Sequence, residues 1–176
     1  VVISESRLPI LIAAVPNPKE VPISKTFSGL KYFINRINSF AFLFEIPATV
    51  FNFVITMPSV DFQKICRDMN SLADIIEIQS VGQQLRFSCK GDFVEQETII
   101  GEADNGMVFV NNSTNINEIV QGLFMLKNLV MFTKCTNLCN IINIYIKNDY
   151  PLIIKYNIAS IGDIKLCLAP KTDNED

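Results

Sequence analysis

The sequence predicts an α+β domain in which a βαβββ unit occurs twice, and two observations carry this prediction. Segments in which apolar and polar residues alternate, as in half-buried strands, recur along residues 50–170. Two other segments have helical spacing instead, and each comes after a strand in the sequence. Because each unit offers one helix and a run of antiparallel strands, the simplest packing lays both helices on the same face of a common sheet.

The first unit is predicted to begin with a strand at 50–57 and a helix at 59–70. The segment Met57-Pro58-Ser59 places a proline and a capping serine at the start of that helix. An apolar stripe on the helix consists of Phe62, Ile65, Cys66 and Met69. Strands at 74–80, 84–90 and 95–101 complete the unit, with the Gly82 region turning the first pair.

The second unit follows a polar break at 102–106. Its predicted elements are a strand at 107–111, a helix at about 117–133, and strands at 140–147, 151–158 and 163–169, with Asn148-Asp149 as a hairpin turn. The expected core stripe of this helix consists of Ile119, Leu123, Leu126 and Val130. Further apolar residues widen the stripe, so amphipathicity alone cannot orient the helix.

Both predicted helices carry cations away from their apolar stripes. Lys64 and Arg67 lie about 60° apart on one helix, and Lys127 and Lys134 share a face of the other. The net charge of −3 would ordinarily argue against a nucleic-acid partner, but acidic residues gather in Glu95–Asp104 and in the tail Asp173–Asp176. One surface can therefore be basic in an acidic protein, although solvated cations explain the same pattern.

Composition argues against an enzyme. The chain contains no histidine, which removes the commonest general base, and it lacks nucleotide-binding glycine motifs. Its five cysteines have no zinc-site spacing, and Cys66, Cys89 and Cys167 are expected to be buried, inert thiols. We therefore expect no metal and no cofactor. No apolar run is long enough to cross a membrane, and no credible signal peptide is present, so an intracellular protein is expected.

Several ordered motifs resemble proliferating cell nuclear antigen, the eukaryotic and archaeal-type sliding clamp, from about Ile46 to the C-terminus. These motifs are Met57-Pro58-Ser59 with Phe62 and Ile65-Cys66-Arg67-Asp68, then Phe132-Thr133-Lys134, Pro151-Leu152-Ile153-Ile154-Lys155-Tyr156 and Leu168-Ala169-Pro170-Lys171 with an acidic tail. The resemblance implies the DNA-clamp fold, with the C-terminal clamp domain at 49–170 and an acidic tail at 171–176.

The front of the chain resembles the family less closely. Ala14-Val15-Pro16-Asn17-Pro18-Lys19-Glu20-Val21 is similar to the last hairpin of the family's N-terminal domain, which makes 1–33 a remnant of that domain. Residues 34–48 then become the interdomain connecting loop. This loop departs from the family by carrying Phe40-Ala41-Phe42-Leu43-Phe44 where relatives are more acidic and less aromatic.

The resemblance implies a topological tether rather than a catalyst. In the family, three subunits close a ring around duplex DNA in the nucleus, and the helices line its hole. DNA polymerase, flap endonuclease, DNA ligase and the clamp loader dock outside through a short peptide motif, and no membrane is involved. The positions that match basic hole-lining residues are Lys64, Arg67, Lys127 and Lys134. Such contacts reach phosphates and carry no base information, which suits sliding.

The resemblance also places an apolar groove for partner peptides between the connecting loop and the C-terminal strands. The matching positions are Phe44, Ile46, Pro47, Pro151, Cys167, Ala169 and Pro170. Cys167 departs from the usual tyrosine, which puts the depth of the pocket in question. Gly82 stands where many relatives have a modified lysine, so ubiquitin signalling at that site is not expected.

Two alternatives to a ring-forming clamp subunit remain open from sequence. One is a partner-binding module that keeps the peptide groove without encircling DNA. The other is a subunit of a damage-checkpoint clamp. For this chain alone we expect self-association at exposed strand edges, with the edge at Glu95–Gly101 and a possible remnant at Phe27–Tyr32, but no stable closed trimer.

Overall fold

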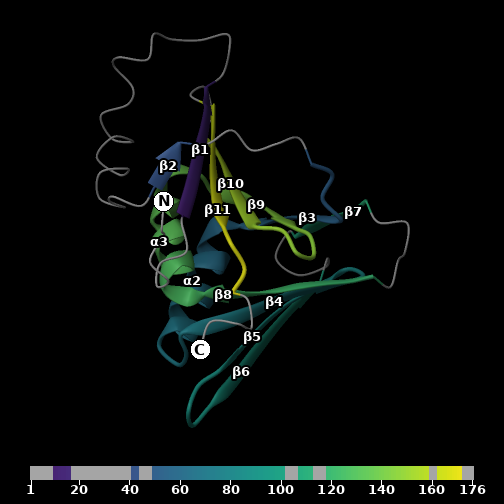
Figure 1. Cartoon of the computed structure of the whole chain (residues 1–176), viewed down its shortest axis with the longest axis vertical. Coiled ribbons are helices and arrows are strands. Elements are labelled where there is room, and N and C mark those ends of the chain that lie inside the picture. The colour runs from purple at the N-terminus through teal and green to yellow at the C-terminus, as the bar shows by residue number, and fades with distance from the viewer. Residues whose placement is uncertain are drawn as a thin grey trace, which may run out of the picture.

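Two sheets, antiparallel except for one parallel pairing, and a pair of packed helices form the fold in the computed structural model (Figure 1). The structure describes residues 10–16, 41–43, 49–101, 107–112, 118–158 and 162–171. In these ranges no helix has the length and apolar character needed to cross a membrane. The α+β class and the two helices on antiparallel sheets are confirmed.

The first βαβββ unit follows the sequence prediction closely. It consists of β3 (Phe53–Pro58), α2 (Ser59–Asn70), β4 (Ile75–Val81), β5 (Gln84–Lys90) and β6 (Glu95–Gly101). Gly82 has φ +58° in the turn between β4 and β5, a conformation that glycine adopts without steric cost. The predicted apolar stripe faces inward, with Phe62, Cys66 and Met69 fully buried.

Ser59 does not cap α2, contrary to the sequence prediction. Pro58 is the N-cap residue, and it makes no side-chain capping hydrogen bond. The Ser59 hydroxyl instead donates to the Cys139 carbonyl oxygen at 2.6 Å, and the Ser59 amide donates to the Asn140 carbonyl oxygen at 2.9 Å. This serine therefore joins the start of α2 to residues 139–140, which lie within the second unit.

The second unit contains the largest error of the sequence analysis. Its elements are β7 (Val108–Asn111), β8 (Ile119–Met125), α3 (Leu126–Phe132), the 3₁₀ helix η1 (Thr133–Leu138), β9 (Ile141–Ile146), β10 (Leu152–Ile158) and β11 (Gly162–Leu168). The predicted helix at 117–133 is a strand over its first part, because residues 119–125 pair with the whole of β4. Ile119, expected in the core stripe, is half exposed.

The expected common sheet is divided in two. The seven-stranded sheet has the order β2-β1-β11-β10-β9-β3-β7, and the four-stranded sheet has the order β6-β5-β4-β8. β1 (Ile10–Pro16) pairs antiparallel with β11, and β2 (Ala41–Leu43) pairs in parallel with β1. The predicted strand remnant at Phe27–Tyr32 lies outside the described residues, and the domain limits at 33, 48 and 170 stay predictions.

The core lies between the inner faces of the sheets and the helices. Alternation buries Phe53, Ile55 and Met57 of β3, and the same period buries the inward residues of β4, β5, β9 and β10. A hydrogen bond also joins β10 to α3, because the Tyr156 hydroxyl donates to the Phe132 carbonyl oxygen at 3.1 Å. These contacts fix α2 and α3 on one side of the molecule, where they pack against each other (Figure 1).

Candidate nucleic-acid interface and partner groove

The four cations predicted to meet DNA are exposed on two adjoining helical segments. Lys64 and Arg67 lie on α2, opposite its buried stripe. Lys127 lies at the start of α3, and Lys134 lies in η1. We call these four residues the helix cations. Because all four side chains reach solvent and their elements pack together, the structure places four positive charges on the helical side of the domain.

Specific polar contacts hold these segments together. The Gln63 side-chain amide donates to the Thr133 carbonyl oxygen at 3.0 Å, which joins α2 to η1. The Thr136 hydroxyl donates to the Ser59 carbonyl oxygen at 3.5 Å. Both bonds cross between elements about 70 residues or more apart in sequence, so the relative position of the helix cations follows from the packing of the two halves.

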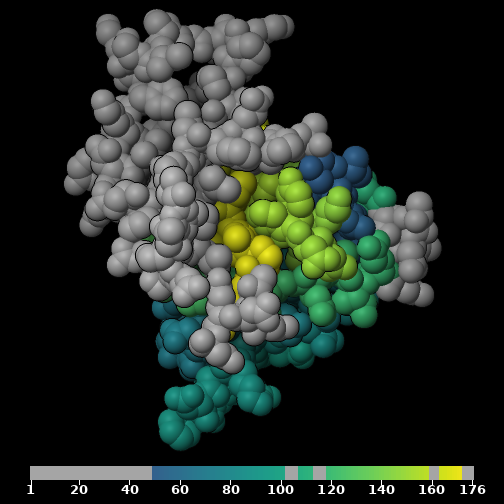
Figure 2. Space-filling model, viewed as in Figure 1, coloured from purple at the N-terminus to yellow at the C-terminus, as the bar shows by residue number. Residues whose placement is uncertain are grey.

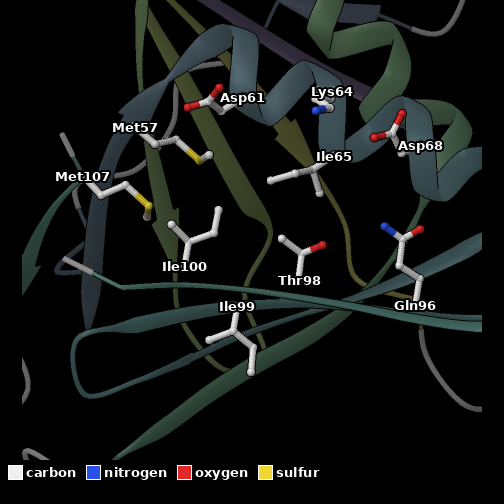
Figure 3. A pocket seen from close by; sticks show the side chains of 10 residues that line it. All are labelled: Met57, Asp61, Lys64, Ile65, Asp68, Gln96, Thr98, Ile99, Ile100 and Met107. Carbon is white, nitrogen blue, oxygen red and sulfur yellow. The ribbon is translucent and has the colours of Figure 1, made fainter. Parts of the chain in front are cut away.

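Lys64 differs from the other helix cations in its surroundings. It lines a cleft of about 490 Å³ between α2 and β6, together with Asp61 and Asp68 (Figure 3). These two carboxylates stand three residues before and four residues after Lys64, the spacings at which side chains on a helix interact. Arg67 has no acidic residue at these spacings. The positive potential at Lys64 is therefore reduced more than that at Arg67.

Four of the five cysteines are buried free thiols, and Cys139 is a partly exposed one. Cys66, Cys89 and Cys167 are buried, as the sequence predicts. Burial raises the pKa of the Cys66 thiol and raises that of Cys135 to about 12. Since a thiolate is the reactive form, these side chains are packing residues. In the described ranges no group of three or more cysteine and carboxylate side chains is placed to hold a metal ion.

The predicted partner groove lies partly within the described residues. Phe44, Ile46 and Pro47 fall outside them. Pro151, Ala169 and Pro170 are partly exposed at the ends of neighbouring strands, whereas Cys167 is only 4% exposed. Burial raises the pKa of the Cys167 thiol to about 11, and nearby Lys165 opposes this rise. Cys167 therefore contributes to the floor of this region rather than to its open surface.

An aromatic cluster beside Pro151 escaped the sequence analysis. The Phe51 ring meets the Tyr145 and Tyr150 rings edge to face, at centroid distances of 5.3 and 5.5 Å. The Tyr150 hydroxyl lies 3.2 Å from the Thr49 hydroxyl. Residues 49–52 meet the β9–β10 hairpin on the face shown in Figure 2. The sequence signal for it was Tyr145, an aromatic residue that lies on the outward face of β9 together with Asn143.

The strand register extends this cluster into an apolar row across the outer face of the seven-stranded sheet. Adjacent strands bring the members of the row opposite one another in the order Val110, Val54, Tyr145, Ile153 and Cys167. Side chains in such cross-strand positions contact one another directly. Val110, Val54 and Tyr145 are at least partly exposed, whereas Ile153 and Cys167 are buried. The outer face therefore offers an apolar contact surface only along the first part of the row, separate from the helix cations on the other side of the core.

Comparisons with known proteins agree with this architecture. The family model "Proliferating cell nuclear antigen, C-terminal domain" matches residues 45–171. A "Probable DNA polymerase sliding clamp 1" of Paramecium bursaria Chlorella virus 1 is 38% identical over 130 residues, which is 72% of this chain and 48% of that protein. A "Probable DNA polymerase sliding clamp" of Acanthamoeba polyphaga mimivirus is 33% identical over 125 residues, 71% of this chain and 26% of that protein.

A solved structure shows the same fold. The crystal structure of Proliferating Cellular Nuclear Antigen from Entamoeba histolytica superimposes with a TM-score of 0.65 and 26% sequence identity. The superposition covers 77% of this chain and 52% of that one. The chain thus spans about half the length of this structure and of the Chlorella virus relative, and about a quarter of the mimivirus one.

Proposed function

The chain belongs to the proliferating cell nuclear antigen family, and from this membership we propose that it acts as the C-terminal part of a DNA sliding clamp subunit. The clamp is a polymerase processivity factor that encloses duplex DNA and performs no chemistry of its own. The observation that carries the proposal is the set of four exposed cations on α2, α3 and η1, on a domain that matches the family along residues 45–171.

The helix cations suit a protein that slides. Contacts from lysine and arginine to phosphates neutralise charge without reading base edges, so binding does not depend on sequence. Four cations supply only a few such contacts, and each is weak in solvent. A ring is therefore held on DNA by its closure, while the helix cations keep the duplex centred as the ring moves.

The two edge strands of the four-stranded sheet, β8 and β6, differ in the contacts along their outer edges. The β8 edge of the four-stranded sheet is capped: the Asn148 side chain accepts from the Gln121 amide at 2.9 Å and donates to the Ile119 carbonyl oxygen at 3.0 Å. The Lys171 amide donates to the Leu123 carbonyl oxygen at 2.7 Å. At the other edge, β6 has only β5 beside it among the described strands. We propose that a neighbouring subunit adds to β6, and that three subunits close the ring.

Partner enzymes are proposed to bind the opposite, outer face. Pro151, Ala169 and Pro170 with the aromatic cluster offer an apolar surface for a peptide that carries aliphatic and aromatic anchors. DNA polymerase, flap endonuclease, DNA ligase and the clamp loader are the proposed partners. Action in the nucleus is likewise a proposal, and the viral clamps among the relatives make the site of DNA replication the more general location.

Charge reversal in an assembled ring tests the proposed role of the helix cations. Because the chain spans about half of its Chlorella virus relative, the test uses a fusion of residues 1–176 with the part of that clamp outside the match. Changing Lys64, Arg67, Lys127 and Lys134 together to glutamate is expected to abolish stimulation of a polymerase on primed circular DNA. Peptide binding, measured by titration, should stay unchanged because the groove lies on the other face.

Retention of the trimer, checked by sedimentation, is the control for this experiment. Polymerase stimulation that survives all four changes in an intact trimer would remove the assignment of the helix cations to DNA. That result would favour a partner-binding module that does not depend on DNA contact.

A further inference from the structure

The groove proposed for partner peptides is bounded by two segments that meet where β10 begins and β11 ends. One is the turn of the β9–β10 hairpin, residues 147–151, and the other is residues 169–171 after β11. We call these two segments the groove walls. Leu152 lies opposite Leu168 in the strand register, so the groove walls begin side by side. Their relative position sets the shape of the surface that a peptide meets.

The β8 edge holds the first groove wall through the side chain of Asn148. This side chain accepts a hydrogen bond from the Gln121 amide at 2.9 Å and donates one to the Ile119 carbonyl oxygen at 3.0 Å. In an antiparallel strand, the backbone groups of alternate residues point to opposite edges. The groups that bond to Asn148 therefore lie on the edge of β8 that does not pair with β4.

The same edge of β8 holds the second groove wall. The Lys171 amide donates to the Leu123 carbonyl oxygen at 2.7 Å, two residues further along β8 than Gln121. Ile119, Gln121 and Leu123 are alternate residues, so their free backbone groups lie on one edge. After β11 the chain crosses to β8 (Figure 1). A single strand edge therefore fixes both groove walls.

Contacts within the hairpin link Asn148 to the side chains that are proposed to face the peptide. The Tyr150 ring meets the Phe51 ring edge to face at 5.5 Å, and the Lys147 ammonium group lies 5.9 Å from the centre of the Tyr150 ring. Tyr150 stands only two residues after Asn148, and Pro151 follows it directly. A movement of the turn away from β8 would therefore shift the aromatic cluster and Pro151 together.

We propose that the β8 edge is the frame that positions the partner groove, and that Asn148 is a positioning residue for peptide binding. Asn148 acts through Tyr150 and Pro151 rather than by contact with the peptide. A groove whose walls are already fixed loses less conformational freedom when a peptide binds. Loss of a bond to β8 should therefore weaken binding although every apolar side chain of the groove remains. This inference rests on the proposed groove and adds the contacts that keep its shape.

Two single changes in the 176-residue chain separate this role from general stability. Asn148→Ala removes both bonds to β8, whereas Gln79→Ala removes only the exposed 2.8 Å bond between the side chains of Gln79 and Gln121. The probe is a fluorescein-labelled peptide with one glutamine, one leucine and two phenylalanines, and its affinity is measured by anisotropy. Asn148→Ala is expected to weaken binding about fivefold, because two exposed hydrogen bonds contribute modestly. Gln79→Ala should leave the affinity unchanged.

The second groove wall offers a matched pair of variants at one residue. Lys171→Pro removes the amide that bonds to Leu123, whereas Lys171→Ala removes the same side chain and keeps that amide. The affinity for the peptide should therefore be about threefold lower for Lys171→Pro than for Lys171→Ala.

Hydrogen exchange adds a readout that a purely structural role of Asn148 would not change. If the peptide and the bonds of Asn148 favour the same arrangement, each must stabilise the other. The peptide is therefore expected to slow exchange of the Gln121 amide in the unchanged chain and in Gln79→Ala, but not in Asn148→Ala. Urea unfolding of each variant checks that the fold is retained.

The outcomes distinguish the positioning role from the proposed function. Equal affinities of Asn148→Ala and the unchanged chain, or of the two Lys171 variants, would overturn the positioning role and leave the groove in place. An equal loss of affinity in Gln79→Ala and Asn148→Ala, or no slowing of Gln121 exchange by the peptide, would also overturn it. If the unchanged chain does not bind the peptide, the proposed groove itself fails and the inference fails with it.

Discussion

Single charges on α2 differ in what they can contribute to the proposed binding of DNA. Lys64 lies between Asp61 and Asp68 on the wall of the cleft, whereas Arg67 has no acidic residue one turn away along the helix. Opposite charges at these spacings attract each other and reduce the field that a phosphate meets. The two cations that the sequence pattern treats as equivalent are therefore unequal in the structure.

Neutralising Lys64 and Arg67 one at a time tests whether they contribute unequally to the proposed DNA binding. In the ring-forming fusion, Arg67→Gln is expected to weaken DNA-dependent stimulation of a polymerase more than Lys64→Gln does. Titration of salt should show that Arg67→Gln lowers the slope of log affinity against log salt by up to about 0.9, and that Lys64→Gln lowers it less. A larger loss from Lys64→Gln would contradict the assignment of Lys64 to the side of the helix that faces β6.

The buried thiols predict how stability depends on pH. Burial raises the pKa of Cys66 and Cys135, so the folded chain keeps protons that the unfolded chain loses above about pH 8.5. Below that pH, these thiols should not make the free energy of unfolding depend on pH. Above it, each thiol should lower this free energy by up to about 1.4 kcal/mol per pH unit.

Urea unfolding in reducing buffer between pH 7.5 and 9.5 measures this slope. The double variant Cys66→Ala with Cys135→Ala should show a flatter dependence over the same range, whatever its stability at pH 7.5. Parallel dependences in the two proteins would mean that these thiols do not link protonation to folding.

The elements show where sequence periodicity is sufficient to predict a helix or a strand. Residues 59–70 have one strong helical stripe, and α2 has the predicted bounds. Residues 119–125 read as Ile-Val-Gln-Gly-Leu-Phe-Met, an apolar run that suits a helix or a strand. Seven consecutive pairings with β4 make it a strand, and the helix begins only at Leu126. The pairing with β4, a strand distant in sequence, makes this segment a strand, and the local sequence pattern does not reveal that pairing.

The candidate surfaces also include some residues that local sequence predicts and others that only long-range contacts bring together. The exposure of Lys64 and Arg67 could be predicted from sequence because charges opposite an apolar stripe stay exposed once the helix packs. Lys127 and Lys134 were identified by a shared helical face and by the family resemblance, since the apolar stripe of their predicted helix was too wide to orient it.

The aromatic cluster could not be predicted, because Phe51, Tyr145 and Tyr150 come together only when residues before β3 meet the β9–β10 hairpin. Ser59 is likewise predicted from sequence to cap its own helix, but in the structure its hydroxyl donates to the distant Cys139 carbonyl oxygen.

At the scale of the whole molecule, the two sheets separate three kinds of contact. The helical side carries the helix cations, the outer face of the seven-stranded sheet carries the apolar row, and β6 forms an edge of the four-stranded sheet. Sequence alone predicted one common sheet, because nothing local shows that β8 pairs with β4 while β1 pairs with β11. The proposed contacts with DNA, with a neighbouring subunit and with an enzyme therefore lie on different surfaces.

Topological linkage to DNA is the most direct test of the central claim that this chain is part of a sliding clamp. The ring-forming fusion is loaded by its clamp loader onto nicked circular plasmid, washed in high salt to remove contacts to phosphate, and counted before and after the plasmid is cut once. We predict that the fusion stays on the circle through the wash and is lost when the circle is opened. Equal retention on circular and linear DNA, or loss from the circle of a fusion that forms trimers and is loaded, would contradict the claim.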